Sequence, residues 1–209
     1  IVEYGSAGFT RGTGTTTVVN DTSYQLNGLT TLTSYDVYVR AVCGANDSSS
    51  VKKLTFRTNC VPLADSTLPL FESFDTWTTT TMDQCWLRGT SDGSTTYPSF
   101  STSYGHTGSK SVYMYSSNTS YSILSLPSFT TPIDSLQISF GLYKTNTSYT
   151  HEIHVGVMTD PNDISTFVPI DTVAASTLSN WEMFEIPLSS YTGTGGHIAL
   201  VSPNGAYSY

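Results

Sequence analysis

The sequence predicts an all-β protein, and three observations carry that prediction. Only 11% of the 209 residues are charged, while Ser and Thr make up roughly a third of the chain, a share that suits pleated strands and turns. No stretch has apolar residues sustained at the three- and four-residue spacing of an amphipathic helix. Short alternating runs recur instead, separated by clusters of Gly, Pro, Asn and Asp.

The distribution of charge divides the chain near residue 60. Residues 1–60 hold five basic and four acidic residues, a net charge of +1, whereas residues 61–209 hold three basic and twelve acidic residues, a net charge of −9. Such a change indicates a domain boundary, so we expect domains at residues 1–60 and 61–209. Nucleic-acid binding draws on clusters of Lys and Arg, and the overall charge of −8 argues against it. The sequence has no run of 18 apolar residues that would span a membrane.

The first domain contains a clear hairpin over residues 35–58. The run SYDVYVRAV alternates between apolar and polar positions, as a half-buried strand does. The loop CGANDSSS follows, and VKKLTFRT is a second alternating run that is expected to pair with the first. Further strands are expected at residues 1–9, 15–19 and 22–26.

The first domain also carries a local pattern of known type. Leu29, Thr33 and Tyr35 have the spacing found around the tyrosine corner of fibronectin type III domains, in which a Tyr hydroxyl bonds back to the main chain. Thr31 stands where that family usually has Pro. Residues 1–60 therefore resemble a fibronectin type III domain. A sandwich of this kind needs about seven strands, so the resemblance implies a partial domain whose first two strands are missing.

The second domain, after a short linker (VPLADST), contains about nine strand-like runs. Turn clusters separate them, among them residues 91–93, 161–163 and 193–196. Strands at this spacing predict an antiparallel β-sandwich in the form of a jelly roll. The expected strands are LPLFESF (68–74), QCWLRG (84–89), KSVYMY (110–115), YSILSLP (121–127), SLQISFGLY (135–143), HEIHVGVM (151–158), STFVPIDTV (165–173), WEMFEIPL (181–188) and HIALVS (197–202).

Several phrases of the second domain follow one another in a characteristic order: LPLFESFDTW, QCW, GHTGSKSVYMY, VGVMTDPNDISTFVPIDTV and WEMFEIPLSSYTGTGGHIALVS. They resemble the cleaved-adhesin and choice-of-anchor J group of Bacteroidetes surface modules, which is related in shape to MAM domains. The resemblance covers most of residues 68–202 and implies a secreted or cell-surface protein that forms part of a larger multidomain chain. It also implies that the last strand of this adhesin-type jelly roll is missing, because the family's closing strand would follow residue 209.

The three cysteines allow two interpretations. In the expected hairpin Cys43 ends one strand and Cys60 follows the other, so the two lie about 25 Å apart at ~3.3 Å per residue, beyond disulfide reach. Cys60 and Cys85 flank the domain boundary and the first strand of the second domain, which favours a Cys60–Cys85 disulfide with Cys43 as a buried thiol. The alternative is three free thiols in a reducing compartment. No C-x-x-C occurs, so zinc and thioredoxin-type chemistry have no support.

Two short motifs resemble catalytic signatures, and their context argues against catalysis. The motif GTSDG at residues 89–93 matches G-x-S-x-G, but the following STTYP does not form the helix that a nucleophile elbow needs, so an Asp-Gly turn is predicted. The motif HEIH at residues 151–154 lies in an expected strand, whereas a zincin places two His four residues apart on a helix. We expect one of these His side chains to be buried or at the rim, the other to be in solvent, and the protein not to be an enzyme.

Aromatic residues in polar loops are candidates for binding glycans, because the C–H faces of sugars stack on rings while their hydroxyls bond nearby amides. Trp86 and Trp181 lie within apolar runs and are expected in the core. The candidates for ligand binding are Trp77, Tyr97, Tyr104 and Tyr121.

The resemblance to jelly-roll binding modules implies one cofactor, a structural Ca²⁺. Glu72 and Asp75 would supply carboxylates and the turn at residues 108–110, around Ser109, would supply carbonyls, since Ca²⁺ prefers oxygen ligands. The alternative is a solvated acidic pair at the end of a strand.

Two hypotheses about function follow. The first is a non-catalytic binding module of a secreted or cell-surface bacterial protein, recognising a glycan or a host or other extracellular protein. The second is a structural spacer, because fibronectin-like units often hold the protease or glycosidase domain of a surface enzyme at a distance. An exposed aromatic cluster on one face of the sandwich would favour the first.

Overall fold

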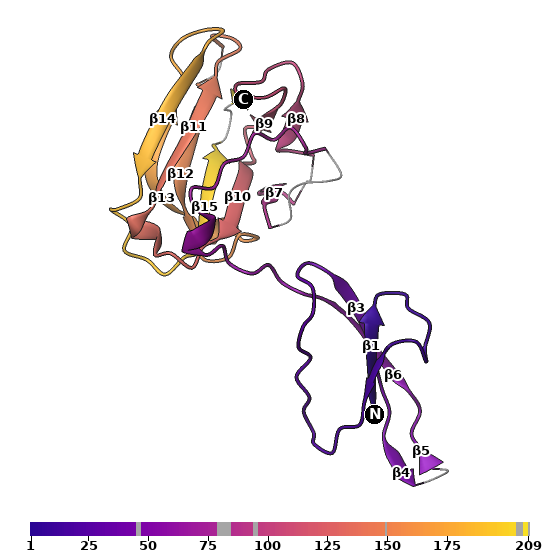
Figure 1. The fold of residues 1–209 in the computed structure, drawn as a ribbon. Coiled ribbons are helices and arrows are strands. Elements are labelled where there is room, and N and C mark those ends of the chain that lie inside the picture. The colour runs from indigo at the N-terminus through magenta and orange to yellow at the C-terminus, as the bar shows by residue number, and fades with distance from the viewer. Residues whose placement is uncertain (45–46, 79–84, 94–95, 149, 204–206, 209) are drawn as a thin grey trace. The chain divides into compact units, whose positions relative to one another are not determined.

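The computed structural model describes residues 1–44, 47–78, 85–93, 96–148, 150–203 and 207–208. These fall into two compact units, unit 1 at residues 1–61 and unit 2 at residues 62–209 (Figure 1). All strand ladders are antiparallel, which confirms the predicted fold class. The helices among the described residues are the short 3₁₀ segments η1 (Asp65–Thr67), η2 (Ile133–Ser135) and η3 (Ile164–Thr166).

Unit 1 is built on a four-stranded antiparallel sheet of order β2-β1-β3-β6. Its strands are β1 (Val2–Ser6), β2 (Thr15–Thr17), β3 (Ser34–Val39) and β6 (Lys52–Arg57). The predicted hairpin is present, since β3 pairs with β6 along its whole length. Two short strands, β4 (Val42–Gly44) and β5 (Asp47–Ser48), form a separate ladder in a segment that was expected to be a loop.

The strand expected at residues 22–26 is absent, so that prediction is wrong. Local side-chain bonds replace it: the Thr22 N–H donates to Asp21 Oδ1 at 2.6 Å, and Asn27 Nδ2 donates to the carbonyl of Gln25 at 3.4 Å. Bonds of this kind compete with a strand ladder. Tyr24, the large side chain of the segment, remains exposed, so burial does not favour a strand here.

Tyr35 ties the preceding loop to the sheet. Its hydroxyl accepts a hydrogen bond from the Thr30 N–H at 3.0 Å, which is the back-bond that the tyrosine-corner pattern predicts. Its ring stacks on Phe56 of the neighbouring strand, with centroids 6.1 Å apart. Tyr35 and Val37 are the buried apolar residues in the described part of this unit.

The opposite face of β3 buries a charge. Asp36 is only 1% exposed, and its carboxylate accepts hydrogen bonds from Thr55 Oγ1 at 2.6 Å and from the Gly8 N–H at 2.7 Å. Lys53 Nζ completes the group at 2.9 Å. The hydrogen bond from Thr55, followed by those from Gly8 and Lys53, lowers the pKa of Asp36 to about 2. A buried polar network therefore helps to hold unit 1 together.

Unit 2 is a two-layered sandwich. The first layer is a five-stranded sheet of order β13-β12-β15-β10-β7. Its strands are β13 (Val168–Ala174), β12 (Glu152–Met158), β15 (His197–Ser202), β10 (Ser122–Ser128) and β7 (Leu87–Thr90). The second layer contains the pair β11 (Gln137–Tyr143) and β14 (Trp181–Pro187), drawn in orange in Figure 1, and the ladder of β16 (Tyr207–Ser208), β9 (Ser111–Tyr115) and β8 (Ser99–Ser101).

The two layers meet in one apolar core. Alternate residues of β12 and β11 face it, which is the period-2 pattern of half-buried strands. The opposite face of the five-stranded sheet carries a second, smaller cluster, over which Ile164 and Phe167 pack. The core residues of these strands are Ile153, Val155 and Val157 of β12 and Ile138, Phe140 and Leu142 of β11; the second cluster is Ile123, Met158, Ala199 and Val201.

Two differences from the predicted strands of unit 2 have clear causes. Residues 68–74 form no strand: Pro69 has no N–H to donate, Glu72 Oε1 accepts the Phe74 N–H at 2.6 Å, and Phe74 has a φ of 63°, in the left-handed region. Strand β8 was not predicted, because its sequence SFS is too short to show alternation. Residue 84 of the expected strand at 84–89 lies outside the described residues, and β7 begins at residue 87.

Candidate functional site

Strands β11 and β14 place two aromatic side chains side by side on the surface. The ladder pairs Tyr143 with Trp181, and their ring centroids are 5.3 Å apart. Side chains alternate along a strand, and Leu142 and Phe184 face the core. Tyr143 and Trp181 therefore lie on the face turned away from the core.

The loop between β8 and β9 adds two further rings. Tyr104 lies 4.8 Å from Tyr143 and His106 lies 5.2 Å from Trp181, measured between centroids. Tyr104, Tyr143 and Trp181 are half-buried, and His106 is exposed. We call the continuous series His106, Trp181, Tyr143 and Tyr104 the aromatic row.

Gly141 allows the indole of Trp181 to lie close to the strand. A Cβ atom at this position would be 3.0 Å from Trp181 Cε3 and 3.2 Å from Met183 Sδ, so even an alanine would displace one of them. Met183, the ladder partner of Gly141, is 56% exposed. It extends the apolar surface of the aromatic row along β14.

Polar side chains lie on the same face of β11 and β14, next to the aromatic row. Ser139 pairs with Glu185 and Gln137 pairs with Pro187, further along the ladder from Tyr143. Ser139, Glu185 and Gln137 are all exposed. They provide a hydroxyl, a carboxylate and an amide, which together donate and accept hydrogen bonds. This face thus combines flat apolar rings with hydrogen-bonding groups.

Tyr97, Tyr113 and Tyr115 form a second aromatic group. The Tyr97 centroid is 4.9 Å from that of Tyr115 and 5.7 Å from that of Tyr113. All three are half-buried. Alternation along β9 places Tyr113 and Tyr115 opposite the core residues Val112 and Met114.

The predicted ligand-binding tyrosines are distributed over separate places. Tyr104 belongs to the aromatic row and Tyr97 to the second aromatic group. Tyr121 is 37% exposed and belongs to neither; its N–H donates to Ser91 Oγ at 2.9 Å.

Trp77 is a core residue, so its prediction as a ligand-binding residue is wrong. It is 1% exposed, and its ring packs edge-on against Phe74, Trp86 and Phe100, with centroids 5.0, 5.2 and 5.5 Å away. These partners lie in separate segments, and the polar residues on either side of Trp77 gave no sign of burial. Trp86 is buried as predicted, whereas Trp181, predicted in the core, lies in the aromatic row.

Strand alternation contains the signal that would have identified the aromatic row. In the sequence of β14, the apolar Phe184 and Ile186 share one face, which places Trp181 with Glu185 on the other. The same alternation in β11 separates Tyr143 from the core. Nothing in the sequence indicates that the loop carrying Tyr104 and His106 folds onto these two strands.

The two carboxylates predicted to bind Ca²⁺ accept hydrogen bonds from nearby N–H and hydroxyl groups. Asp75 Oδ1 accepts hydrogen bonds from the Ser109 N–H (2.6 Å), Ser109 Oγ (3.0 Å) and the Lys110 N–H (3.1 Å), so the turn presents donors rather than carbonyls. These bonds, that of the Ser109 N–H first, lower the pKa of Asp75. Glu72 is engaged with Phe74. In the described part of the chain, no three His, Cys, Asp or Glu side chains gather as metal ligands.

Residues 152–154 of the HEIH motif lie in β12, whereas His151 precedes the strand and has a φ of 48°. His151 is fully buried, with Nε2 3.0 Å from the carbonyl of Asn146, and burial lowers its pKa. His154 is partly exposed and pairs with Glu152 Oε1 at 2.6 Å. The prediction of one buried and one wetter His is confirmed.

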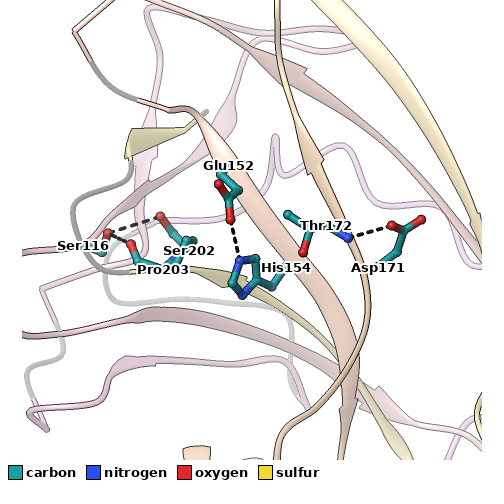
Figure 2. Close-up of polar contacts among 7 residues, drawn as sticks. All are labelled: Ser116, Glu152, His154, Asp171, Thr172, Ser202 and Pro203. Atoms are coloured by element: carbon teal, nitrogen blue, oxygen red, sulfur yellow. Dashed lines mark hydrogen bonds and ion pairs between the residues drawn. The ribbon is translucent and has the colours of Figure 1, made fainter.

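Figure 2 shows the surroundings of His154 near the ends of several strands. Ser116 Oγ lies 3.5 Å from Ser202 Oγ and donates to the carbonyl of Pro203. The Thr172 N–H donates to Asp171 Oδ1 at 2.7 Å. The contacts of Ser116 join the end of β9 to the end of β15, and the Thr172–Asp171 bond lies within β13, so both have a structural role.

The GTSDG motif is a turn, as predicted. The Gly93 N–H donates to the carbonyl of Thr90 at 2.9 Å, and Gly93 has a φ of 79°, which favours glycine. Residues 94 and 95 lie outside the described residues, and residues 96–98 are not helical.

The three cysteines differ in oxidation state. Cys60 and Cys85 are disulfide-bonded, whereas Cys43 is a free thiol. Cys43 is exposed rather than buried, so that prediction is wrong. It lies on the short strand β4, whose residues are all exposed because its ladder partner β5 is too small to cover them. None of the described helices is long and apolar enough to cross a membrane.

Of the comparisons with known proteins, the one with solved structures found a match. No protein-family model matches the sequence, and no curated protein matches it. Among solved structures, the chain is similar to one described in connection with the promiscuous specificity of carbohydrate-binding modules of the β-sandwich superfamily. That match has a TM-score of 0.40 and 11% sequence identity, and covers 84% of this chain and 71% of the other.

Proposed function

We propose that this chain is a non-catalytic binding region of a secreted or cell-surface protein, and that the aromatic row of unit 2 binds glycans. The observation that carries the proposal is the row itself, in which four rings from two strands and one loop adjoin on a single face. Sugars offer apolar C–H faces to rings of this kind and hydroxyls to the polar groups beside them. Ser139, Glu185 and Gln137 stand on that same face.

An extracellular location has separate support. Disulfides persist in oxidising surroundings such as the cell surface, and Cys60 and Cys85 are disulfide-bonded. The low content of charged residues and the abundance of Ser, Thr and Tyr are compatible with that location.

A glycan array probed with the whole chain, followed by titration with the strongest glycan, tests the proposal. We expect Trp181→Ala to lower the affinity tenfold or more, equivalent to about 1.4 kcal/mol, because it removes the largest ring of the row. Tyr121→Ala is the matched control, since Tyr121 is exposed and lies outside the row. A blank array, or equal losses for the two variants, would contradict the proposal and favour the spacer hypothesis.

A further inference from the structure

A small polar hollow lies at the end of the β11–β14 ladder that is remote from the aromatic row. Its volume is about 310 Å³, within the roughly 300–1,000 Å³ of small-molecule sites. Two loops line it, residues 129–134 before β11 and residues 191–196 after β14. Tyr143 and Trp181 stand at the other end of this ladder, about 20 Å away at ~3.4 Å per residue. The hollow and the aromatic row share no residue.

The first loop is held in place by residues that do not line the hollow. The Thr130 N–H donates a hydrogen bond to the carbonyl of Leu63 at 2.8 Å, and Thr130 Oγ1 donates to the same carbonyl at 3.1 Å. Thr131 Oγ1 donates to Asp65 Oδ1. Leu63 and Asp65 lie outside the lining. This wall of the hollow is therefore fixed without using the groups that a ligand would meet.

The second loop lies closely around one buried ring. Tyr191 is buried, and its hydroxyl accepts the Gly195 N–H at 2.7 Å. A Cβ atom at Gly193 or Gly195 would collide with this hydroxyl, so only glycine lets the main chain come so near. The Phe129 N–H joins the two loops by donating to the carbonyl of Gly196 at 3.2 Å. Main chain forms much of this wall, and a ligand need not order it on binding.

Several polar groups that line the hollow are free to bind a ligand. Asp134, Thr192 and Thr194 are exposed, and among the described residues their side chains have no hydrogen-bond partner. The main-chain N–H groups of residues 192–194 also make no hydrogen bond within the described part of the chain. The carboxylate accepts, the N–H groups donate, and the hydroxyls do both. This combination matches a ligand that carries several hydroxyl groups.

We propose that this hollow is a second sugar-binding site, which takes one neutral sugar residue. Sugar hydroxyls donate to the Asp134 carboxylate and accept from the N–H groups of residues 192–194, while Phe129 and Pro132 offer apolar surface to a C–H face. Asp134 and the net charge of −9 on residues 61–209 disfavour an anion. A Ca²⁺ ion is disfavoured because Asp134 is the one carboxylate that the described residues bring to the hollow. The proposal does not depend on the aromatic row.

Titration of the ¹⁵N-labelled whole chain with the methyl glycosides of glucose, galactose, mannose and N-acetylglucosamine tests the proposal. We expect at least one of them to shift the amide resonances of residues 192–194 saturably, with a Kd in the millimolar range. Asp134→Asn should weaken this binding about fivefold or more, because it removes the charged acceptor. Thr194→Trp, at an exposed position, should abolish it by filling the hollow. Asp171→Asn, at an exposed position outside the hollow, is the matched control and should leave the affinity unchanged.

A further variant separates this site from the aromatic row. Trp181→Ala should leave the shifts of residues 192–194 unchanged, so the hollow can bind sugar even if a glycan array shows no role for the row. Loss of these shifts in Trp181→Ala would overturn the proposal and place the sugar on the row.

Three other results would also overturn the proposal. The first is that none of the four glycosides shifts these amides. The second is that Asp134→Asn and Thr194→Trp bind as Asp171→Asn does. The third is a shift with CaCl₂ but with no glycoside, which would assign the hollow to a cation. If Thr194→Trp does not fold, the comparison of Asp134→Asn with Asp171→Asn decides.

Discussion

Unit 1 and unit 2 bury different kinds of side chain. The described part of unit 1 buries Tyr35 and Val37 together with the charged Asp36 and its partners, whereas unit 2 buries a continuous apolar core between two layers. Apolar burial contributes about 25 cal/mol per Å² and depends little on pH. A buried carboxylate stabilises only in its charged form and only with its partners present. The two units should therefore respond differently to core truncation and to acid.

The largest expected effect is in unit 2. Trp77→Ala removes a ring that packs against Phe74, Trp86 and Phe100, and should lower the free energy of unfolding by about 3–5 kcal/mol. Hydrogen exchange, resolved to peptides of each unit, measures the loss. Tyr121→Ala on the surface serves as the control and should stay within about 0.5 kcal/mol. A loss below about 1 kcal/mol for Trp77→Ala would contradict the close packing of Trp77 against these three rings.

Acid should distinguish unit 1. The folded pKa of Asp36, about 2, lies below the usual 3.8, so its network stabilises unit 1 above about pH 4 and that contribution is lost as the pH falls from about 4 to about 2. Asp36→Asn should destabilise unit 1 at neutral pH and flatten this dependence. Hydrogen exchange of the β3 and β6 amides between pH 2 and 6 measures this pH dependence. Asp47→Asn, at an exposed position, is the control. An unchanged pH profile in Asp36→Asn would exclude the network as the cause.

A smaller effect is expected where unit 1 relies on a single neutral hydrogen bond. Tyr35→Phe keeps the ring on Phe56 and removes the hydroxyl that accepts the Thr30 N–H, so unit 1 should lose about 1 kcal/mol. Tyr24→Phe is the control, because the Tyr24 hydroxyl makes only a long, exposed contact at 3.4 Å. If chemical denaturation gave the same loss of unfolding free energy for both variants, the Tyr35 hydrogen bond would make no specific contribution to the stability of unit 1.

The smallest expected effect is that of metal removal. Asp75 is satisfied by donors from Ser109 and Lys110, so EDTA should leave the thermal midpoint of unit 2 unchanged, because only ligands bound to the folded state raise it. Added Ca²⁺ should have no effect either. A midpoint that rises with Ca²⁺ and falls with EDTA would restore the predicted site at Glu72 and Asp75 and imply a rearranged turn.

Strands with period-2 alternation could be predicted from the sequence because that pattern reports directly on burial. The runs containing β11 and β14 are examples. The segment at residues 68–74 has the same apolar character, yet Pro69 and the bond between Glu72 and Phe74 prevent a ladder. Short strands such as β8 form by pairing with a neighbouring strand, here β9, and three residues are too few to show alternation in the sequence.

The aromatic row was only partly predictable for a related reason. Tyr104 could be selected because it stands in a polar loop, but Trp77 satisfies the same criterion and is buried by residues from other segments. Trp181 stands in an apolar run and is nevertheless on the surface, because β14 has one face on the core and one in solvent. Which loops converge on that face depends on tertiary contacts.

The contrast among the three tryptophans has an optical consequence. All of them belong to unit 2, and Trp77 and Trp86 are enclosed in the core, whereas Trp181 lies half-buried in the aromatic row. A soluble collisional quencher therefore reaches the indole of Trp181 before the other two. The chain carries an intrinsic fluorescent probe at one end of β14, and a molecule that covers the row would shield that probe while the emission of the two core indoles stayed constant.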